Sequence, residues 1–173
     1  MALFISGTDT GVGKTWVCAA LAGELKGRGV GVTTQKWIQT GCIDQSEDLL
    51  AHMAAMGDAH MDADRCPYVL PLPASPHLAA KAAGISIDIE IIKRAFHRLS
   101  TRYEQVLVEG AGGALVPVNQ ETLMIDIVRD LRLKVMIVVP NRVGCINHTL
   151  LTVEAYERRD IEVMGVVMNP INQ

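Results

Sequence analysis

Two features of the sequence predict an α/β fold in which a mostly parallel central sheet is flanked by helices on both faces, giving three layers. Short apolar runs are predicted to be strands. The first is residues 2–5, and four more, rich in Val, Ile, Leu or Met, are predicted to be buried on both faces: residues 30–36, 105–109, 134–139 and 163–168. Segments with the apolar spacing of helices lie between them. This alternation is typical of βαβ units, which build parallel sheets. Ligands of such sheets bind beyond the carboxyl ends of the strands.

The composition places broad limits on function. The chain has 173 residues, of which 49% are apolar and 20% charged, and its formal net charge is −3. We expect one domain spanning residues 1–173, with a substantial core. No basic stripe of the kind that binds nucleic acid is present. No apolar run has membrane length and no signal-type segment is evident, so a cytoplasmic protein is expected, with its four scattered cysteines reduced.

The first predicted strand leads into a glycine-rich turn, Gly7–Thr15, with the sequence GTDTGVGKT. Backbone N–H groups of such a turn, together with the start of the following helix, bind an anion. Lys14 would reach the outer phosphates of a nucleoside triphosphate, and Thr15 would offer its hydroxyl to Mg²⁺. The loop is one residue longer than the standard spacing, because Thr8 stands where the first glycine is usual. The alternative is a plain strand-to-helix turn with a surface lysine.

The helices between the strands have predictable ends. Ser46 is expected to cap a helix that runs to residue 56, and Ser86 is expected to cap another. Four prolines within residues 66–76 predict an extended loop there. Further helices are expected at residues 13–26, 123–131 and 147–157.

Charged residues end two more of the predicted strands. Lys36 ends the second strand, where it is either functional or an ordinary solvated strand end. Glu109 ends the third strand, at a position where nucleotide hydrolases place a carboxylate for Mg²⁺, and the glycines that follow let a ligand approach the backbone. The alternative for Glu109 is an exposed acid in a glycine-rich turn. Asp48 is a weaker candidate carboxylate, because acidic residues are common in the first turn of any helix.

The fourth predicted strand ends at Pro140, and residues 143–148 lead into a helix. Free N–H groups at this helix start could hold a substrate carboxylate. Alternatively this is an ordinary helix start, with Cys145 and His148 as packing residues. A cysteine–histidine nucleophile has no other support in the sequence.

Taken together, these segments resemble the ATP-dependent dethiobiotin synthetase family, whose members have the P-loop NTPase fold. The resemblance extends from Met1 to about Pro170, nearly the whole chain. The matching segments are Gly7–Thr15, Lys36–Gly41, Ser46–Asp48, Ser75–His77, Val108–Gly113, Gly144–His148 and Asn169–Pro170.

The resemblance implies a reaction and its co-substrates. In the family, an amine of 7,8-diaminopelargonic acid takes up CO₂ as a carbamate, and ATP phosphorylates the carbamate. The second amine then closes the ureido ring of dethiobiotin, an intermediate of biotin synthesis, and ADP and phosphate are released. Because each stage is anionic, such a site needs fixed positive charge and Mg²⁺ more than it needs a nucleophile.

The resemblance also implies roles for individual residues. Lys36 matches the family's active-site lysine, which stabilises the carbamate and the transferring phosphoryl group, and Lys14 shares the phosphates. Thr15, Asp48 and Glu109 match the Mg²⁺ ligands. Further nucleotide contacts are implied for Gly11, Val12, Gly13, Trp16, Gly110, Ala111, Gly112, Asn169 and Pro170. Substrate contacts are implied for Thr10, Thr40 and Gly112 and, from the second subunit of a homodimer, for Cys145, Ile146 and Asn147.

Two features depart from the family's pattern. Trp37 stands where the family usually has proline, so the loop that carries Lys36 is expected to follow a different path. The chain also ends at Gln173, whereas family members continue for tens of residues with another strand and a second adenine-binding segment. Two other functions stay open. One is a different P-loop ATPase, such as a cobyrinic-acid-type amide synthase or a partition ATPase; the other, suggested by the short C-terminal end, is a nucleotide-binding protein without turnover.

We expect this chain to bind nucleoside triphosphates with only weak preference for adenine, because its phosphate loop matches the family while a second adenine-binding segment is not found in it. Comparable affinities for ATP, GTP and CTP in a binding titration would support this expectation. Strong selectivity for ATP would contradict it.

Overall fold

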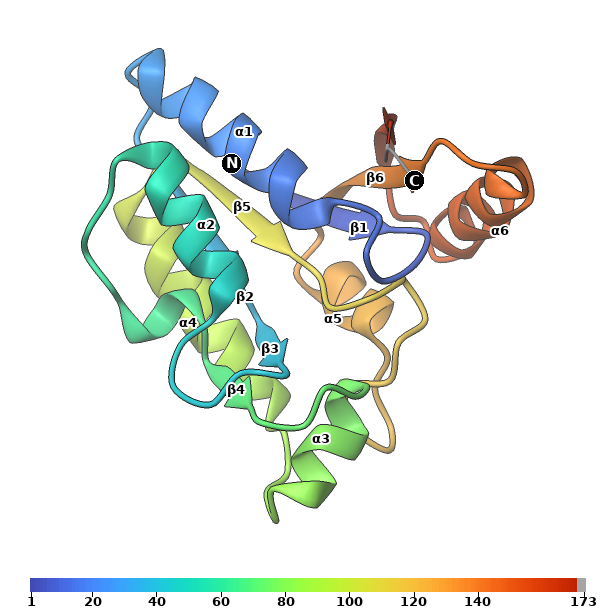
Figure 1. Ribbon diagram of the computed structural model, residues 1–173, viewed down its shortest axis with the longest axis horizontal. Coiled ribbons are helices and arrows are strands. Elements are labelled where there is room, and N and C mark those ends of the chain that lie inside the picture. Colours follow the sequence, from blue (N-terminus) through green and yellow to red (C-terminus); the bar gives the residue numbers. More distant parts are fainter. Residues whose placement is uncertain (171–173) are drawn as a thin grey trace.

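A computed structural model, which describes residues 1–170, has a five-stranded central sheet in the order β2-β5-β1-β6-β7 (Figure 1). Each neighbouring pair of strands is parallel. The predicted α/β class is therefore confirmed. The strands are β1 (Ala2–Gly7), β2 (Val32–Lys36), β5 (Gln105–Glu109), β6 (Lys134–Pro140) and β7 (Val163–Asn169).

Helices cover both faces of this sheet. Successive side chains of a strand point to opposite sides, and both faces carry apolar side chains that pack against helices. Ile5 of β1 packs with apolar residues of α1 (Lys14–Gly27) and α2 (Glu47–Met56). Phe4, its neighbour, packs in a second cluster on the other face. That cluster includes buried residues of α4 (Ile89–Arg102), α5 (Met124–Asp130) and α6 (Cys145–Glu157).

The segment between β2 and α4 contains elements that the sequence did not predict. Residues 66–76, expected to be an extended loop throughout, include β4 (Tyr68–Leu70), which pairs in parallel with β3 (Ile38–Thr40) in a small second sheet. These strands have only three residues each, too few to show a period. The last residue of the expected loop, Pro76, is the first residue of α3 (Pro76–Ala82), a position where its missing N–H costs no hydrogen bond.

One of the two predicted caps is confirmed and the other is wrong. Ser46 Oγ accepts a hydrogen bond from Leu49 N at 3.1 Å. Ser86 does not cap α4; Asp88 does, its Oδ1 accepting from Glu90 N at 2.8 Å. The buried residue between them, Ile87, contributes to the core, so the chain stays extended for two more residues before the helix starts.

The last strand is less buried than expected. β7 lies at the edge of the sheet and pairs with β6. Its side chains alternate between partly buried and exposed, and Met164, Val166 and Met168 are on the exposed side. The expectation of burial on both faces is therefore wrong for this strand. Across residues 1–170, no helix combines the length and the apolar character that crossing a membrane requires.

The opposite edge strand, β2, is covered by a buried arginine. Arg65 belongs to the short 3₁₀ helix Ala63–Arg65 and is 1% exposed. Its Nε donates to Thr34 O at 3.2 Å and its Nη2 to Thr34 Oγ1 at 3.0 Å. Its Nη1 donates to Asp58 Oδ2 at 2.8 Å and to His60 O at 3.1 Å. One side chain thus satisfies polar groups of the edge strand and of the connection after α2.

We predict that Arg65→Met lowers the free energy of unfolding by about 2–4 kcal/mol, because it leaves buried acceptors without a donor. The matched control is Arg28→Met, which removes an exposed pair with Glu24 and should cost less than about 1 kcal/mol. Urea denaturation measures both variants. Equal small losses would show that Arg65 does not hold the edge.

Candidate active site

The register of the sheet brings the predicted strand-end residues together. Lys36 at the end of β2 is paired with Glu109 at the end of β5. Ile5 of β1 is also paired with Glu109, and the glycine-rich turn begins two residues later. Residues distant in the sequence therefore meet at one edge of the sheet.

The glycine-rich turn curls around the side chain of Lys14. Gly11 and Gly13 have φ values of 72° and 93°, in the left-handed region that favours glycine. Lys14, the first residue of α1, is 6% exposed, and its Nζ donates to Asp9 O at 2.9 Å. The ammonium group is thus held inside the turn, at the start of a helix, where an anion is favoured.

The end of β7 touches this turn. Asn169 Nδ2 donates to Val12 O at 3.0 Å. A Cβ added at Gly13 would lie 2.0 Å from the same amide nitrogen, so glycine is required there for space as well as for its backbone angle. Asn169, followed by Pro170, therefore lies against the phosphate loop.

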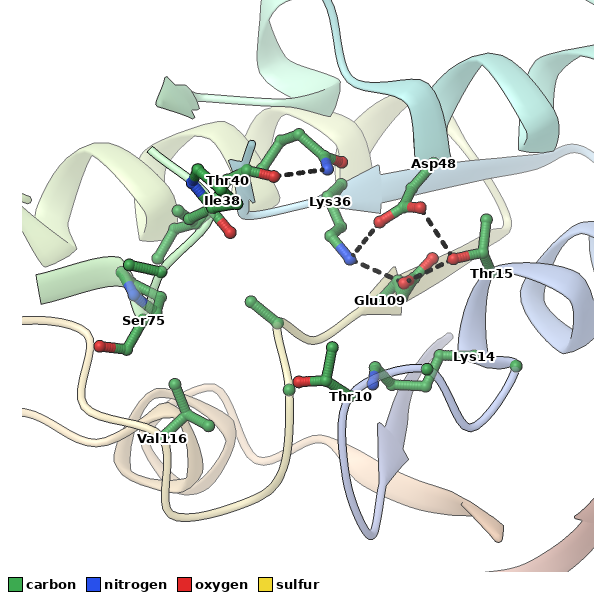
Figure 2. A pocket seen from close by; sticks show the side chains of 18 of the residues that line it. Thr10, Lys14, Thr15, Lys36, Ile38, Thr40, Asp48, Ser75, Glu109 and Val116 are labelled. Atoms are coloured by element: carbon green, nitrogen blue, oxygen red, sulfur yellow. Dashed lines mark hydrogen bonds and ion pairs between the residues drawn. The ribbon is translucent and has the colours of Figure 1, made fainter. Parts of the chain in front are cut away.

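Three oxygen-bearing side chains meet beside Lys14 (Figure 2). Thr15 Oγ1 donates to Asp48 Oδ1 at 2.9 Å, and it lies 3.1 Å from Glu109 Oε1. The three come from α1, α2 and the end of β5, which are brought together by the packing of both helices on the sheet.

Lys36 binds two of these groups. Its Nζ lies 2.6 Å from Asp48 Oδ2 and 2.7 Å from Glu109 Oε1, and it also donates to Gly110 O at 3.3 Å. Figure 2 shows the ammonium between the two carboxylates and facing the open space of the pocket. The alternative of a solvated strand end is therefore wrong for Lys36, which is buried.

The ionisation of these groups follows from their burial and their partners. Burial alone would raise the pKa of Glu109, but the Lys36 charge and the neighbouring His52 outweigh it and lower the pKa to about 2. Burial alone would lower the pKa of Lys36, but the Glu109 and Asp48 carboxylates raise it. Burial, followed by repulsion from Lys36, lowers the pKa of Lys14 to about 8. A bound phosphate would stabilise the charged form of Lys14.

Trp37 does not displace the lysine that precedes it. The indole is fully buried, its Nε1 donates to Gln35 Oε1 at 3.0 Å, and its ring centroid lies 5.1 Å from that of Phe4. The side chain is therefore part of the core under the site. Lys36 reaches both carboxylates with tryptophan at the next position.

These groups open into a cavity of about 740 Å³, enough for a nucleotide's phosphates and a small substrate. Of the predicted contact residues, the cavity is lined by Thr10, Gly11, Gly13, Lys14, Thr15, Trp16, Lys36, Thr40, Asp48, Glu109, Ala111 and Gly112. Sequence reasoning did not assign lining roles to Ile38, Gln39, Pro73, Ala74, Ser75, Pro76 and Val116. A possible signal was the Ser-Pro-His segment at Ser75, although it carried no chemistry of its own.

The predicted substrate contacts on α6 lie elsewhere. Cys145, Ile146 and Asn147 do not line this cavity. They form the first turn of α6, where Ile146 is 74% exposed. They therefore contribute nothing to the pocket within the same chain.

The donor set suits a hard cation that binds oxygen. Within residues 1–170, no group of three or more His, Cys, Asp or Glu side chains has the arrangement to hold a metal ion. Mg²⁺ does not require one, because it is usually held by one or two carboxylates together with phosphate oxygens and waters. The Thr15 hydroxyl and the Asp48 and Glu109 carboxylates, next to a phosphate-binding turn, fit that pattern.

The family model described as an AAA domain matches residues 1–173. An ATP-dependent dethiobiotin synthetase BioD from Chlorobaculum tepidum is 47% identical, over 96% of this chain and 72% of that protein. The dethiobiotin synthetase BioD 2 of Haemophilus influenzae is 41% identical, over 96% of this chain and 90% of its own length.

Comparison with solved structures agrees at the level of the fold. A ParA family ATPase from Chlorobium tepidum superposes with a TM-score of 0.59 over 97% of this chain and 73% of that one, at 13% sequence identity. At that identity the similarity shows only that the two proteins share a fold. Evidence for the reaction comes from the sequence relatives and from the site.

Proposed function

The chain belongs to the ATP-dependent dethiobiotin synthetase family, and we propose that the cavity beside Lys36 is where it catalyses that family's reaction. Its function is ATP-dependent formation of dethiobiotin in biotin biosynthesis. One observation carries the location of the site: the Lys36 ammonium lies 2.6 and 2.7 Å from two carboxylates beside the phosphate loop. A cation, oxygen ligands and an anion cradle in one pocket are what transfer of a phosphoryl group to an anionic acceptor requires.

The proposed substrates are 7,8-diaminopelargonic acid, CO₂ and ATP. One amine of the diamine takes up CO₂ as a carbamate, and a carbamate oxygen attacks the terminal phosphorus of ATP, releasing ADP. The second amine then attacks the carbonyl carbon of the mixed anhydride. The C–O bond to phosphate breaks, the amine loses its proton, and the ureido ring closes. No side chain needs to act as the nucleophile, because the substrate supplies one in each step.

The residues of the pocket would bind, orient and neutralise these anions. Lys14 and the backbone N–H groups of the turn would hold the phosphates, and Lys36 would stabilise the carbamate and the transferring group. Thr15, Asp48 and Glu109 would hold Mg²⁺, which neutralises phosphate charge and polarises the transferring group when bound. The hydroxyls of Thr10 and Thr40, both on the cavity wall, would position the amine or its carbamate.

Of the remaining proposed nucleotide contacts, Gly11, Gly13, Trp16, Ala111 and Gly112 line the same cavity, whereas Val12, Gly110, Asn169 and Pro170 do not. Gly11 and Trp16 would lie along the phosphates, Gly110–Gly112 would approach the nucleotide and substrate with their backbone, and Asn169 with Pro170 would contact adenine. The position of Asn169 against Val12 and Gly13 supports this assignment. We further propose that residues 1–173 act as one ligase domain, in the cytoplasm.

The first turn of α6 is proposed to serve a second subunit. Cys145, Ile146 and Asn147 would bind the substrate carboxylate across a homodimer interface, through N–H groups at a helix start. This proposal is supported by the apolar side chains exposed around this helix, Val143, Ile146, Leu150 and Leu151, since apolar surface of this kind is typical of an interface.

The alternatives have weaker support. A different P-loop ATPase would share the fold, but the ParA family ATPase that superposes on this chain is only 13% identical to it. A nucleotide-binding protein without turnover would not need a lysine buried between the carboxylates of the phosphate site. The ligase accounts for both the sequence relatives and Lys36.

Activity tests the proposal directly. Protein mixed with the diamine, bicarbonate, Mg²⁺ and ATP should give dethiobiotin and ADP, and chelation of Mg²⁺ should stop the reaction. Lys36→Ala should lower the rate of product formation by at least about 100-fold while ATP still binds. This change leaves Glu109 buried without its lysine partner, so it could also destabilise the fold. Lys36→Arg, which keeps the charge, is therefore assayed in parallel, and thermal unfolding of each variant is measured.

The control for these variants is Lys134→Ala, an exposed lysine paired with Glu162, which should leave the rate unchanged. If the wild type binds all its ligands and forms no product, the binding-protein alternative is correct. If folded Lys36 variants retain full activity, the site is elsewhere.

The dimer is tested by mass in solution. Light scattering should give about twice the chain mass of 18.7 kDa. Ile146→Asp, which places a charge on the proposed interface, should shift the protein to the monomer and weaken substrate binding. A monomeric wild type with full activity would contradict the shared site.

A further inference from the structure

A buried imidazole stands behind the carboxylate of Glu109. His52 Nε2 lies 2.8 Å from Glu109 Oε2, and the two side chains are 0% and 1% exposed. His52 follows Asp48 by four residues on α2, so one face of this helix carries both side chains toward Glu109. The same helix thus supplies an acidic residue to the cavity and an imidazole to the far side of the carboxylate.

The two oxygens of Glu109 have separate partners. Oε1 lies 2.7 Å from Lys36 Nζ and 3.1 Å from Thr15 Oγ1, on the cavity side. Oε2 lies against His52. The orientation of the carboxylate, and therefore the direction in which Oε1 is offered, depends on what holds Oε2.

Burying the polar ring of His52 at this position costs stability unless its nitrogens form hydrogen bonds. Its helix neighbours Leu49, Met53 and Met56 are buried apolar residues, and an apolar side chain would pack there without polar atoms to satisfy. Within residues 1–170, neither ring nitrogen has an aligned hydrogen-bond partner, although Nε2 is close to Oε2. A buried polar group left in this way calls for an explanation.

We propose that His52 is a positioning residue for the Mg²⁺–nucleotide site: its Nε2–H donates to Oε2 of Glu109 and holds Oε1 toward Thr15 and the cavity. Hydrogen bonds of this kind, made to the groups that bind a metal, orient them before the metal arrives. This inference rests on the proposed role of Glu109 as a Mg²⁺ ligand.

Three variants separate the donor from the packing. His52→Leu removes the donor and keeps an apolar side chain, whereas His52→Gln keeps an N–H donor. Met53→Leu is the matched control, because it changes a buried neighbour on the same helix while nearly conserving volume. For each, calorimetry measures binding of ADP with Mg²⁺ and with EDTA, and the assay measures the Mg²⁺ concentration that gives half-maximal rate.

We expect His52→Leu to raise that Mg²⁺ concentration by about 10- to 100-fold and to weaken binding of ADP with Mg²⁺. Binding of ADP in EDTA, which uses the phosphate loop alone, should be unchanged. His52→Gln should recover most of the loss, and Met53→Leu should behave like the wild type. Unchanged Mg²⁺ dependence in folded His52→Leu, or an equal loss in His52→Gln, would overturn the positioning role.

A measurement on the wild type decides the question even if His52→Leu does not fold. In ¹⁵N NMR spectra, the ring of His52, assigned through its loss in His52→Gln, should be protonated at Nε2 and should shift when Mg²⁺ and ADP bind. A ring protonated at Nδ1 alone would overturn the inference. The proposed function fails separately, if the wild type makes no dethiobiotin or needs no Mg²⁺.

Discussion

The site depends on keeping one carboxylate, that of Glu109, ionised in the interior. An unpaired carboxylate buried to this degree would take up a proton, because burial disfavours its charge. Lys36 prevents this by contact at 2.7 Å, and the pKa of Glu109 is lowered to about 2. Burial alone would disfavour the charge of Lys36, but its contacts with Glu109 and Asp48 raise its pKa and keep it charged.

The parallel sheet makes this pairing possible. Lys36 and Glu109 are 73 residues apart in sequence, but β2 and β5 are neighbours and end at the same level. The phosphate loop leaves β1 at that edge as well. Two helices packed on the same face then add Thr15 and Asp48. Each group lies on a regular element or directly at its end, so the arrangement is held by packing of the whole domain rather than by a loop of its own.

What could be predicted from the sequence follows from the same geometry. Strand ends of a parallel sheet share an edge, so Lys36 and Glu109 could be placed together once their strands were predicted. The small sheet of β3 and β4 could not be predicted. A strand of three residues is too short to show an alternation of apolar and polar side chains, and its pairing is decided by tertiary contacts. His52 was missed for another reason. His52 follows Asp48 by four residues, a spacing that places both on one face of a helix. Its partner, Glu109, lies on a distant strand, and only the structure shows that contact.

The balance of charge in the pocket also supports the proposal that a divalent cation binds there. Lys14 and Lys36 face Asp48 and Glu109, and their formal charges cancel. A pocket that is neutral in this way does not compensate the several negative charges of a triphosphate. If Lys36 turned to the phosphates, Glu109 would be left buried without its partner, which is costly. Mg²⁺ held by Asp48 and Glu109 would remove both difficulties, because it would compensate these carboxylates and leave Lys36 free for its proposed role beside the carbamate.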